Sequence, residues 1–139
     1  MPAELDDEGI HAIVAMFAPS AERACRAGFD LIEIHGAHGY LVHNFFSPIT
    51  NRRMDQWGGS LESRMRFPVA TARAVRRVWL TNRALGFRIY RTDWRPDDLP
   101  LDDAVLLAKT LKEVGVDYVA MSAGNIAPGI AIPPASPGH

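Results

Sequence analysis

Amphipathic stretches alternate with short apolar runs along this chain of 139 residues. Over residues 6–27, apolar side chains recur at every third or fourth position, which predicts an amphipathic helix. Pro19 lies inside this pattern and has no backbone N–H to donate, so we expect a kink or a break near Ala18. Gly28 follows, and we expect it to end the helix in a left-handed conformation.

A dense apolar run at residues 29–34, interrupted by Glu33, is typical of a strand that is covered on both faces of a parallel sheet. Ser60 is a suitable N-cap for a later helix that begins at Leu61 and reaches about Trp79. The remaining pattern predicts two strands and one helix, at 85–90, 118–121 and about 102–114 respectively. Helices and strands thus alternate, which indicates parallel βα units.

An internal repeat refines this fold class. Residues 27–36 match residues 114–123 in pattern, with a helix end, a glycine, an apolar residue, an aspartate, a strand and then small or polar residues. One predicted strand lies between the two copies, as in a barrel whose alternate strands fill the same interior layers. We therefore expect an α/β fold of the (β/α)8 TIM-barrel class. Because a complete barrel needs about 250 residues, we expect residues 1–139 to be an internal fragment of one domain, incomplete at both ends.

Polar chemistry is concentrated directly after the first predicted strand. His35, His38 and Tyr40 lie within six positions, separated by small residues that allow a tight turn. Because ligands bind at the carboxyl ends of strands in parallel α/β folds, this turn is the candidate site. The alternative is that the two imidazoles are hydrogen-bonded structural groups and that Tyr40 only forms a wall.

The long segment at residues 36–60 is too rich in glycine, proline and asparagine to form a single element. A short helix at 40–46, closed by Ser47 and Pro48, is expected within it. The basic and aromatic residues at 51–60 are interpreted mainly as a solvated surface held by salt bridges.

Composition disfavours several functional classes. Hydrophobic residues make up 47% and charged residues 22% of the chain, which is typical of a globular domain and not of a disordered or membrane-spanning one. The net charge of -1, with acids and bases intermixed, provides no field that attracts nucleic acid or an anionic membrane. Cys25 has no second cysteine to pair with, and the first eight residues are acidic, so we expect a cytoplasmic protein.

Specific motifs extend over almost the whole chain: GFDLIEIHGAHGYL at 28–41, FSP at 46–48, NRR at 51–53, GGSLESRMRF at 58–67, FRIYRTDW at 87–94, VDY at 116–118 and SAGN at 122–125. Together they resemble the central segment of the old yellow enzyme family of FMN-dependent oxidoreductases, in its bacterial branch that pairs two histidines. The resemblance implies that the chain holds about strands four to six of the barrel.

The resemblance also implies an ene-reductase, in which NADPH or NADH reduces FMN and the flavin then reduces the C=C bond of an α,β-unsaturated carbonyl compound. His35 and His38 match the pair that hydrogen-bonds the substrate carbonyl, and the substrate-binding turn includes Gly36 and Ala37. Tyr40 matches the tyrosine that protonates the α-carbon. Fixed donors of this kind stabilise the negative charge that hydride addition develops on the carbonyl oxygen.

Arg88 matches the arginine beside the flavin N1 and C2 carbonyl, where a permanent cation favours the anionic reduced flavin. The alternative is a structural salt bridge with Glu33 or Asp93. A small-molecule enone is the implied partner, no metal is implied, and a homo-oligomer of the intact protein is left open.

Some residues depart from the family pattern. Tyr90 and Arg91 stand where small residues are usual, Met54 and Trp57 replace a more usual Thr and Tyr, and Pro19 interrupts a helix that is normally continuous. We therefore expect altered packing near the flavin edge.

Two other functional classes stay open. A metal-dependent lyase or hydrolase on the same fold would use His35, His38 and either His43 or Glu33 as ligands. The second is a non-catalytic, truncated member of the family, because three strands alone leave apolar edges unpaired. Since the phosphate site of such barrels follows strands seven and eight, we expect that the isolated chain does not bind FMN tightly and is not a well-behaved monomer.

Overall fold

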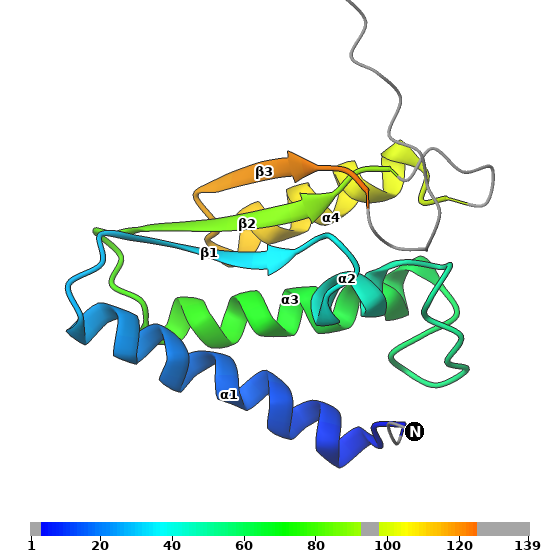
Figure 1. Cartoon of the computed structure of the whole chain (residues 1–139), viewed down its shortest axis with the longest axis horizontal. Coiled ribbons are helices and arrows are strands. Elements are labelled where there is room, and N and C mark those ends of the chain that lie inside the picture. Colours follow the sequence, from blue (N-terminus) through cyan, green and yellow to red (C-terminus); the bar gives the residue numbers. More distant parts are fainter. Residues whose placement is uncertain (1–3, 93–97, 125–139) are drawn as a thin grey trace, which may run out of the picture.

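The computed structural model describes residues 4–92 and 98–124. Figure 1 shows the order of its elements, which are α1 (Asp7–Arg26), β1 (Leu31–Gly36), α2 (Leu41–Phe46), α3 (Leu61–Val78), β2 (Ala84–Tyr90), α4 (Leu101–Val114) and β3 (Tyr118–Ser122). The alternation of helices and strands is thereby confirmed within the described ranges, and α2 is the short helix expected inside the long loop.

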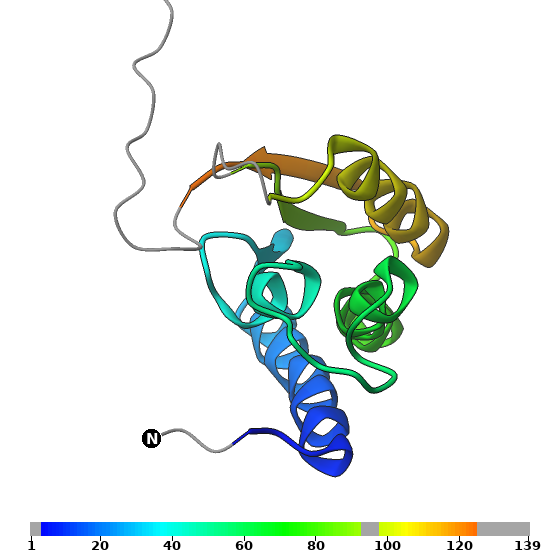
Figure 2. The same cartoon turned by 90° about the vertical axis from the view of Figure 1, so that its right-hand side faces the viewer.

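The three strands form one parallel sheet in the order β1, β2, β3. His35 of β1 lies opposite Arg88 of β2, and Arg88 lies opposite Ala120 of β3. Figure 2 shows α1, α3 and α4 gathered on one side of this sheet. Parallel strands joined by helices are the arrangement that the alternating pattern predicted.

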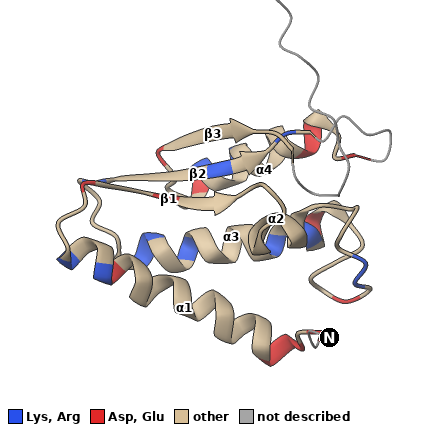
Figure 3. Ribbon diagram, viewed as in Figure 1, with Lys and Arg blue, Asp and Glu red and all other residues tan. Residues whose placement is uncertain are grey.

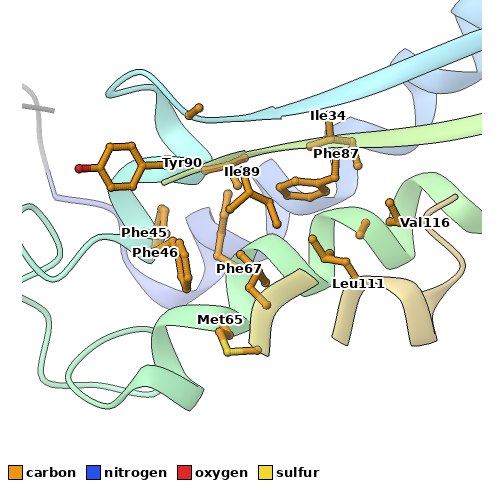
Figure 4. Packing of buried hydrophobic residues seen from close by; sticks show 14 of the residues in the cluster. Ile34, Phe45, Phe46, Met65, Phe67, Phe87, Ile89, Tyr90, Leu111 and Val116 are labelled. Atoms are coloured by element: carbon orange, nitrogen blue, oxygen red, sulfur yellow. The ribbon is translucent and has the colours of Figure 1, made fainter. Parts of the chain in front are cut away.

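The helix-facing side of the sheet holds the hydrophobic core. Leu85, Phe87 and Ile89 alternate along β2 and are at most 1% exposed. In Figure 4, Phe87 and Ile89 lie above Phe67 of α3 and Leu111 of α4. Complete burial of one large apolar side chain contributes about 1.5–3 kcal/mol, so this layer supplies the main contacts that hold the sheet on the helices.

The opposite face of the sheet is covered by no helix of the described residues (Figure 2). Glu33 and His35 of β1 alternate with the core residue Ile34 and so point to this face. At the start of β1, Phe29 is 59% and Leu31 48% exposed. The expectation that the first strand is covered on both faces is therefore wrong for this chain, because its helices all pack on one side.

The first strand also begins later than predicted, at Leu31 instead of Phe29. The cause is the end of α1, where Gly28 has a φ of 87°. The N–H groups of Gly28 and Phe29 donate to the carbonyls of Cys25 and Ala24 at 3.1 and 3.2 Å, which is a Schellman motif. The predicted left-handed helix end is confirmed, and it engages the N–H of Phe29 in the cap.

Helix α1 continues through Pro19, so the predicted break near Ala18 is wrong. Pro19 is exposed, and so is Ala15, whose carbonyl loses its usual donor. Water can therefore satisfy that carbonyl without interrupting the helix. In the same turn the Ser20 hydroxyl donates to the Met16 carbonyl at 3.0 Å.

Charged residues are interspersed over the helices and loops in the view of Figure 3. Helix α3 carries Glu62 in its first turn and Arg76 and Arg77 in its last, which complements the helix dipole. Among the helices of residues 4–92 and 98–124, none combines the length and hydropathy that crossing a bilayer would need.

We predict that Gly86 of β2 does not tolerate a larger residue. A Cβ atom there would overlap Cζ and the hydroxyl oxygen of Tyr118 on β3. Overpacking of this kind costs about 1–3 kcal/mol, so Gly86→Ala should lower the free energy of unfolding by that amount in urea titrations. In a Tyr118→Ala background the same change should cost clearly less, and equal costs in both backgrounds would show that the ring is not the obstacle.

Candidate active site

The turn between β1 and α2 contains two consecutive residues in the left-handed region. His38 has a φ of 56° and Gly39 a φ of 73°, and the Tyr40 N–H donates to the Ala37 carbonyl at 3.3 Å. Positive φ is easy for glycine but uncommon for histidine. The backbone of His38 is therefore strained, and such strain is concentrated at functional sites.

This turn brings together the three side chains that the sequence singled out. The ring centroids of His35 and His38 lie 5.0 Å apart, and those of His35 and Tyr40 lie 5.1 Å apart. Tyr40 is 62% exposed, so a ligand can reach its hydroxyl. The three groups share one small site, whereas their catalytic roles stay predictions.

Gly36 and Ala37 form the buried base of the turn. A Cβ atom on Gly36 would lie 2.5 Å from Phe87 Cε1 and 2.7 Å from the Arg88 carbonyl oxygen. A glycine is required here because the end of β1 lies directly against the Phe87 ring and the Arg88 carbonyl of the neighbouring strand β2. Any contribution of these two residues to substrate binding would therefore come mainly from their backbone.

His38 is linked to the end of β3. Its Nε2 lies 2.5 Å from the Ser122 hydroxyl oxygen, in a partly buried hydrogen bond between residues 84 positions apart. Sequence reasoning did not place Ser122 in the site. A signal was nevertheless present, because the internal repeat aligns Ser122 with His35 at the end of its strand.

Arg88 lies on the same uncovered face, one strand away from the turn. Its Nε donates to Glu33 Oε1 at 2.8 Å, so the salt bridge considered as the alternative role is present with Glu33. Asp93, the other partner considered, lies outside the described residues. Tyr118 lies beside this pair, and burial followed by the negative charge of Glu33 raises the pKa of its hydroxyl above the usual value.

The electrostatic surroundings favour a neutral His35. Partial burial is the first cause that lowers the pKa of this imidazole, and the nearby His38 and Arg88 add to it, while Glu33 opposes the shift. A neutral imidazole still carries one N–H group that can donate a hydrogen bond.

His43 is completely buried under the turn. Its ring stacks on Tyr90 with centroids 3.9 Å apart, and its Nδ1 accepts from the Gly39 N–H. Burial lowers the pKa of His43 from 6.5 to about 4. Tyr90, which departs from the family pattern, is buried and donates its hydroxyl to Asp98 at 2.5 Å. The larger side chain is therefore accommodated by a stack and a hydrogen bond.

The metal alternative names His35, His38, His43 and Glu33 as ligands. The described residues contain no group of three or more His, Cys, Asp or Glu side chains arranged to hold a metal ion. Glu33 is instead paired with Arg88.

Two side chains of the loop before α3, Asn51 and Trp57, are buried. Asn51 is 9% exposed, and its Nδ2 donates to the carbonyls of Phe45 and Trp57 at 2.6 and 2.7 Å. Arg53 does form the expected surface ion pair with Asp55. Most residues of 51–60 are exposed or half-buried, as expected, whereas Trp57 is only 5% exposed and belongs to the core.

Arg64 and Trp57 tie this loop to the helices. Arg64 Nε donates to the Phe46 carbonyl at 3.0 Å and its Nη1 to the Gly59 carbonyl at 2.7 Å. The Trp57 indole N–H donates to Asp7 Oδ1 in the first turn of α1 at 2.6 Å. These contacts fix the segment that follows α2 and so stabilise the base of the turn.

A groove of about 1040 Å³ lies elsewhere, between α1, α3 and α4. Val14, Met65 and Leu106 are among the residues that line it, and none of the turn residues does. The groove is therefore separate from the group formed by His35, His38 and Tyr40.

We predict an acid-dependent loss of stability that is centred on His43. Because the folded pKa of about 4 lies below the unfolded value of 6.5, the unfolded chain takes up the proton first as the pH falls. Stability should decrease between about pH 6.5 and 4 by roughly 3 kcal/mol, measured by urea unfolding. His43→Asn should remove most of this slope and His35→Asn a smaller part, and an unchanged slope in His43→Asn would refute the assignment.

The chain is similar to parts of several longer proteins. NADPH dehydrogenase of Geobacillus sp. (strain WCH70) is 46% identical over 127 residues, which are 91% of this chain and 37% of that protein. Morphinone reductase in complex with tetrahydroNAD superposes with a TM-score of 0.76 at 37% identity, over 86% of this chain and 34% of that one. The complex of 2-naphthoyl-CoA reductase with 2-naphthoyl-CoA superposes with a TM-score of 0.83 at 27% identity, over 88% of this chain and 19% of that one.

The chain thus spans about a third of the NADPH dehydrogenase and morphinone reductase chains that it matches. Its parallel βα units superpose on part of these larger chains, in agreement with the predicted segment of a TIM barrel. The profile of a family described as NADH:flavin oxidoreductase / NADH oxidase matches residues 1–137. The chain therefore belongs to this family, the old yellow enzyme family that its motifs resemble.

Proposed function

We propose that this chain forms the substrate-binding part of an FMN-dependent oxidoreductase that uses NADPH or NADH to reduce the C=C bond of α,β-unsaturated carbonyl compounds. The turn after β1 carries this proposal, because it holds two imidazoles and one phenol with ring centroids 5.0 and 5.1 Å apart. Family membership and the NADPH dehydrogenase relative support a flavin and a nicotinamide. Residues 1–139 then form about strands four to six of one (β/α)8 domain.

His35 and His38 are the proposed donors to the substrate carbonyl oxygen. Addition of hydride to the β-carbon develops negative charge on this oxygen, and fixed N–H groups stabilise that charge more than they stabilise the neutral carbonyl. The lowered pKa of His35 leaves it neutral with one N–H to donate. If the Ser122 hydroxyl donates to His38 Nε2, the neutral ring of His38 carries its proton on Nδ1 and can donate it to the substrate.

Tyr40 is the proposed proton donor. The phenol gives its proton to the α-carbon while hydride arrives at the β-carbon, so the C=C bond gains two hydrogens and solvent restores the proton of Tyr40. Its exposure of 62% and its ring contact with His35 support a position beside the carbonyl that the histidines would hold.

In a closed barrel the uncovered face points inward, and a planar, polar cofactor such as FMN would bind at the carboxyl ends of its strands. Arg88 lies there opposite His35, with 35% of its side chain exposed. Glu33 holds the Nε edge of the guanidinium at 2.8 Å, which orients this planar group. When bound, FMN supplies the hydride that it receives from the nicotinamide, and the permanent charge of Arg88 favours negative charge on the ring.

We predict that Tyr40→Phe separates the two half-reactions in a complete barrel that carries this segment. Reduction of an enone needs the proton of the hydroxyl and should slow by about 100-fold or more. Reduction of the flavin by NADPH needs no such proton and should stay within about twofold of wild type. Stopped-flow absorbance of the flavin measures both rates. Unchanged enone reduction would remove Tyr40 from the role of proton donor.

We also predict that the 139-residue chain alone binds FMN weakly. Arg88 is the single charged contact to the flavin ring that is proposed here, and one such hydrogen bond contributes about 1.5–3 kcal/mol. Micromolar affinity requires about 8 kcal/mol. A fluorescence titration with FMN measures the affinity, and light scattering reports the size of the chain. Micromolar or tighter binding by a compact monomer would show that the ligand set is incomplete.

A further inference from the structure

Consecutive side chains of α2 hold both backbone polar groups of Gly39. The Gly39 N–H donates to His43 Nδ1 at 2.9 Å, and the Gly39 carbonyl accepts from Asn44 Nδ2 at 2.9 Å. Gly39 lies between His38 and Tyr40, so these two contacts connect the buried part of the fold with the middle of the turn. We call these two contacts the Gly39 clamp.

The surroundings of His43 indicate that it serves as a hydrogen-bond acceptor and not only as a packed ring. The ring is 0% exposed, and because Nδ1 is an acceptor, the neutral ring carries its proton on Nε2. Nε2 is buried and has no hydrogen-bond partner among residues 4–92 and 98–124, which is unfavourable. A phenylalanine could also stack on Tyr90 and would avoid that cost. Packing alone therefore does not account for a histidine at this position, whereas an acceptor for the Gly39 N–H does.

The stack on Tyr90 makes this acceptor rigid. The two rings are 3.9 Å apart and inclined by 30°, and the Tyr90 hydroxyl is itself anchored on Asp98. Tyr90 pairs with Ser122 in the sheet, and Ser122 contacts His38. The clamp therefore anchors the turn to Tyr90 at the end of β2.

The turn needs such support because its backbone is strained. His38 and Gly39 both have positive φ, and a non-glycine residue in this conformation persists only where its surroundings enforce it. The N–H and carbonyl of Gly39 change direction if the turn relaxes. Two side chains that bind both groups thus select the left-handed conformation of the turn over its alternatives.

We propose that His43 and Asn44 are positioning residues, which hold Gly39 from both sides and thereby fix the direction in which His38 and Tyr40 face the substrate. This inference rests on the proposed function of the turn. His43 and Asn44 touch neither substrate nor cofactor in it, and they act only through the backbone of Gly39.

The first test detects the clamp itself in a complete barrel that carries this segment. In ¹⁵N-labelled protein, NMR should show a ¹⁵N–¹⁵N coupling across the hydrogen bond between the Gly39 amide and His43 Nδ1. His43→Asn places a carbonyl oxygen near the position of Nδ1 and should keep the Gly39 amide protected from hydrogen exchange. His43→Gln places it one bond further out, and exchange should be about 10-fold faster or more, as in His43→Ala. Absence of the coupling in wild type would overturn the proposal.

The second test measures the effect on the site, in a complete barrel that carries this segment. The probe is 4-hydroxybenzaldehyde, whose phenolate resembles the enolate oxygen. His43→Ala and Asn44→Ala should weaken its binding by about 10- to 100-fold, because a small displacement of positioned groups has effects of this size. His43→Asn should restore binding to within about threefold of wild type.

Two comparisons decide the interpretation. Val42→Ala removes a neighbouring buried side chain of α2 that makes no hydrogen bond to Gly39, so it controls for general loosening. If Val42→Ala weakens the probe as much as His43→Ala, or if His43→Asn does not rescue binding, the positioning role is wrong. If His38→Ala leaves binding unchanged, the proposed function of the turn fails, while the NMR result still reports on the clamp.

Discussion

The parallel pairing of the three strands determines where the chemistry of this chain can lie. It places His35 opposite Arg88 and Tyr90 opposite Ser122, at the carboxyl ends of β1, β2 and β3. The turn after β1 then projects His38 toward the end of β3, where it contacts Ser122. A shift of one residue in this register would move His35 to the helix-facing side, so the site depends directly on the sheet.

The two faces of the sheet differ in polarity and in packing. The helix-facing side is apolar and tightly packed, as shown by Leu85, Phe87 and Ile89. The other side carries the pair formed by Glu33 and Arg88, whose charges are only partly buried. Such a pair contributes modestly to stability. Its greater effect is to keep a guanidinium oriented near the carboxyl ends of the strands, where the proposed cofactor would bind.

The sequence was sufficient for the order of elements and for the group formed by His35, His38 and Tyr40, because periodicity and glycine spacing are local signals. It was insufficient where distant residues meet. The contact of His38 with Ser122 spans 84 positions, and it depends on strand register. Continuity through Pro19 depends on which side of α1 faces solvent, and the late start of β1 depends on the backbone of Phe29 being used by the cap.

The central claim is that His35 and His38 donate hydrogen bonds to one oxygen that becomes negative. Calorimetric titration of a complete barrel that carries this segment with a phenolate tests it most directly, using His35→Ala, His38→Ala and the double variant. Each single replacement should weaken binding by about 1.5–3 kcal/mol, the range for hydrogen bonds to charged groups, and the double variant should bind more weakly than either. Unchanged affinity in both single variants would contradict the claim and leave the two imidazoles as structural groups.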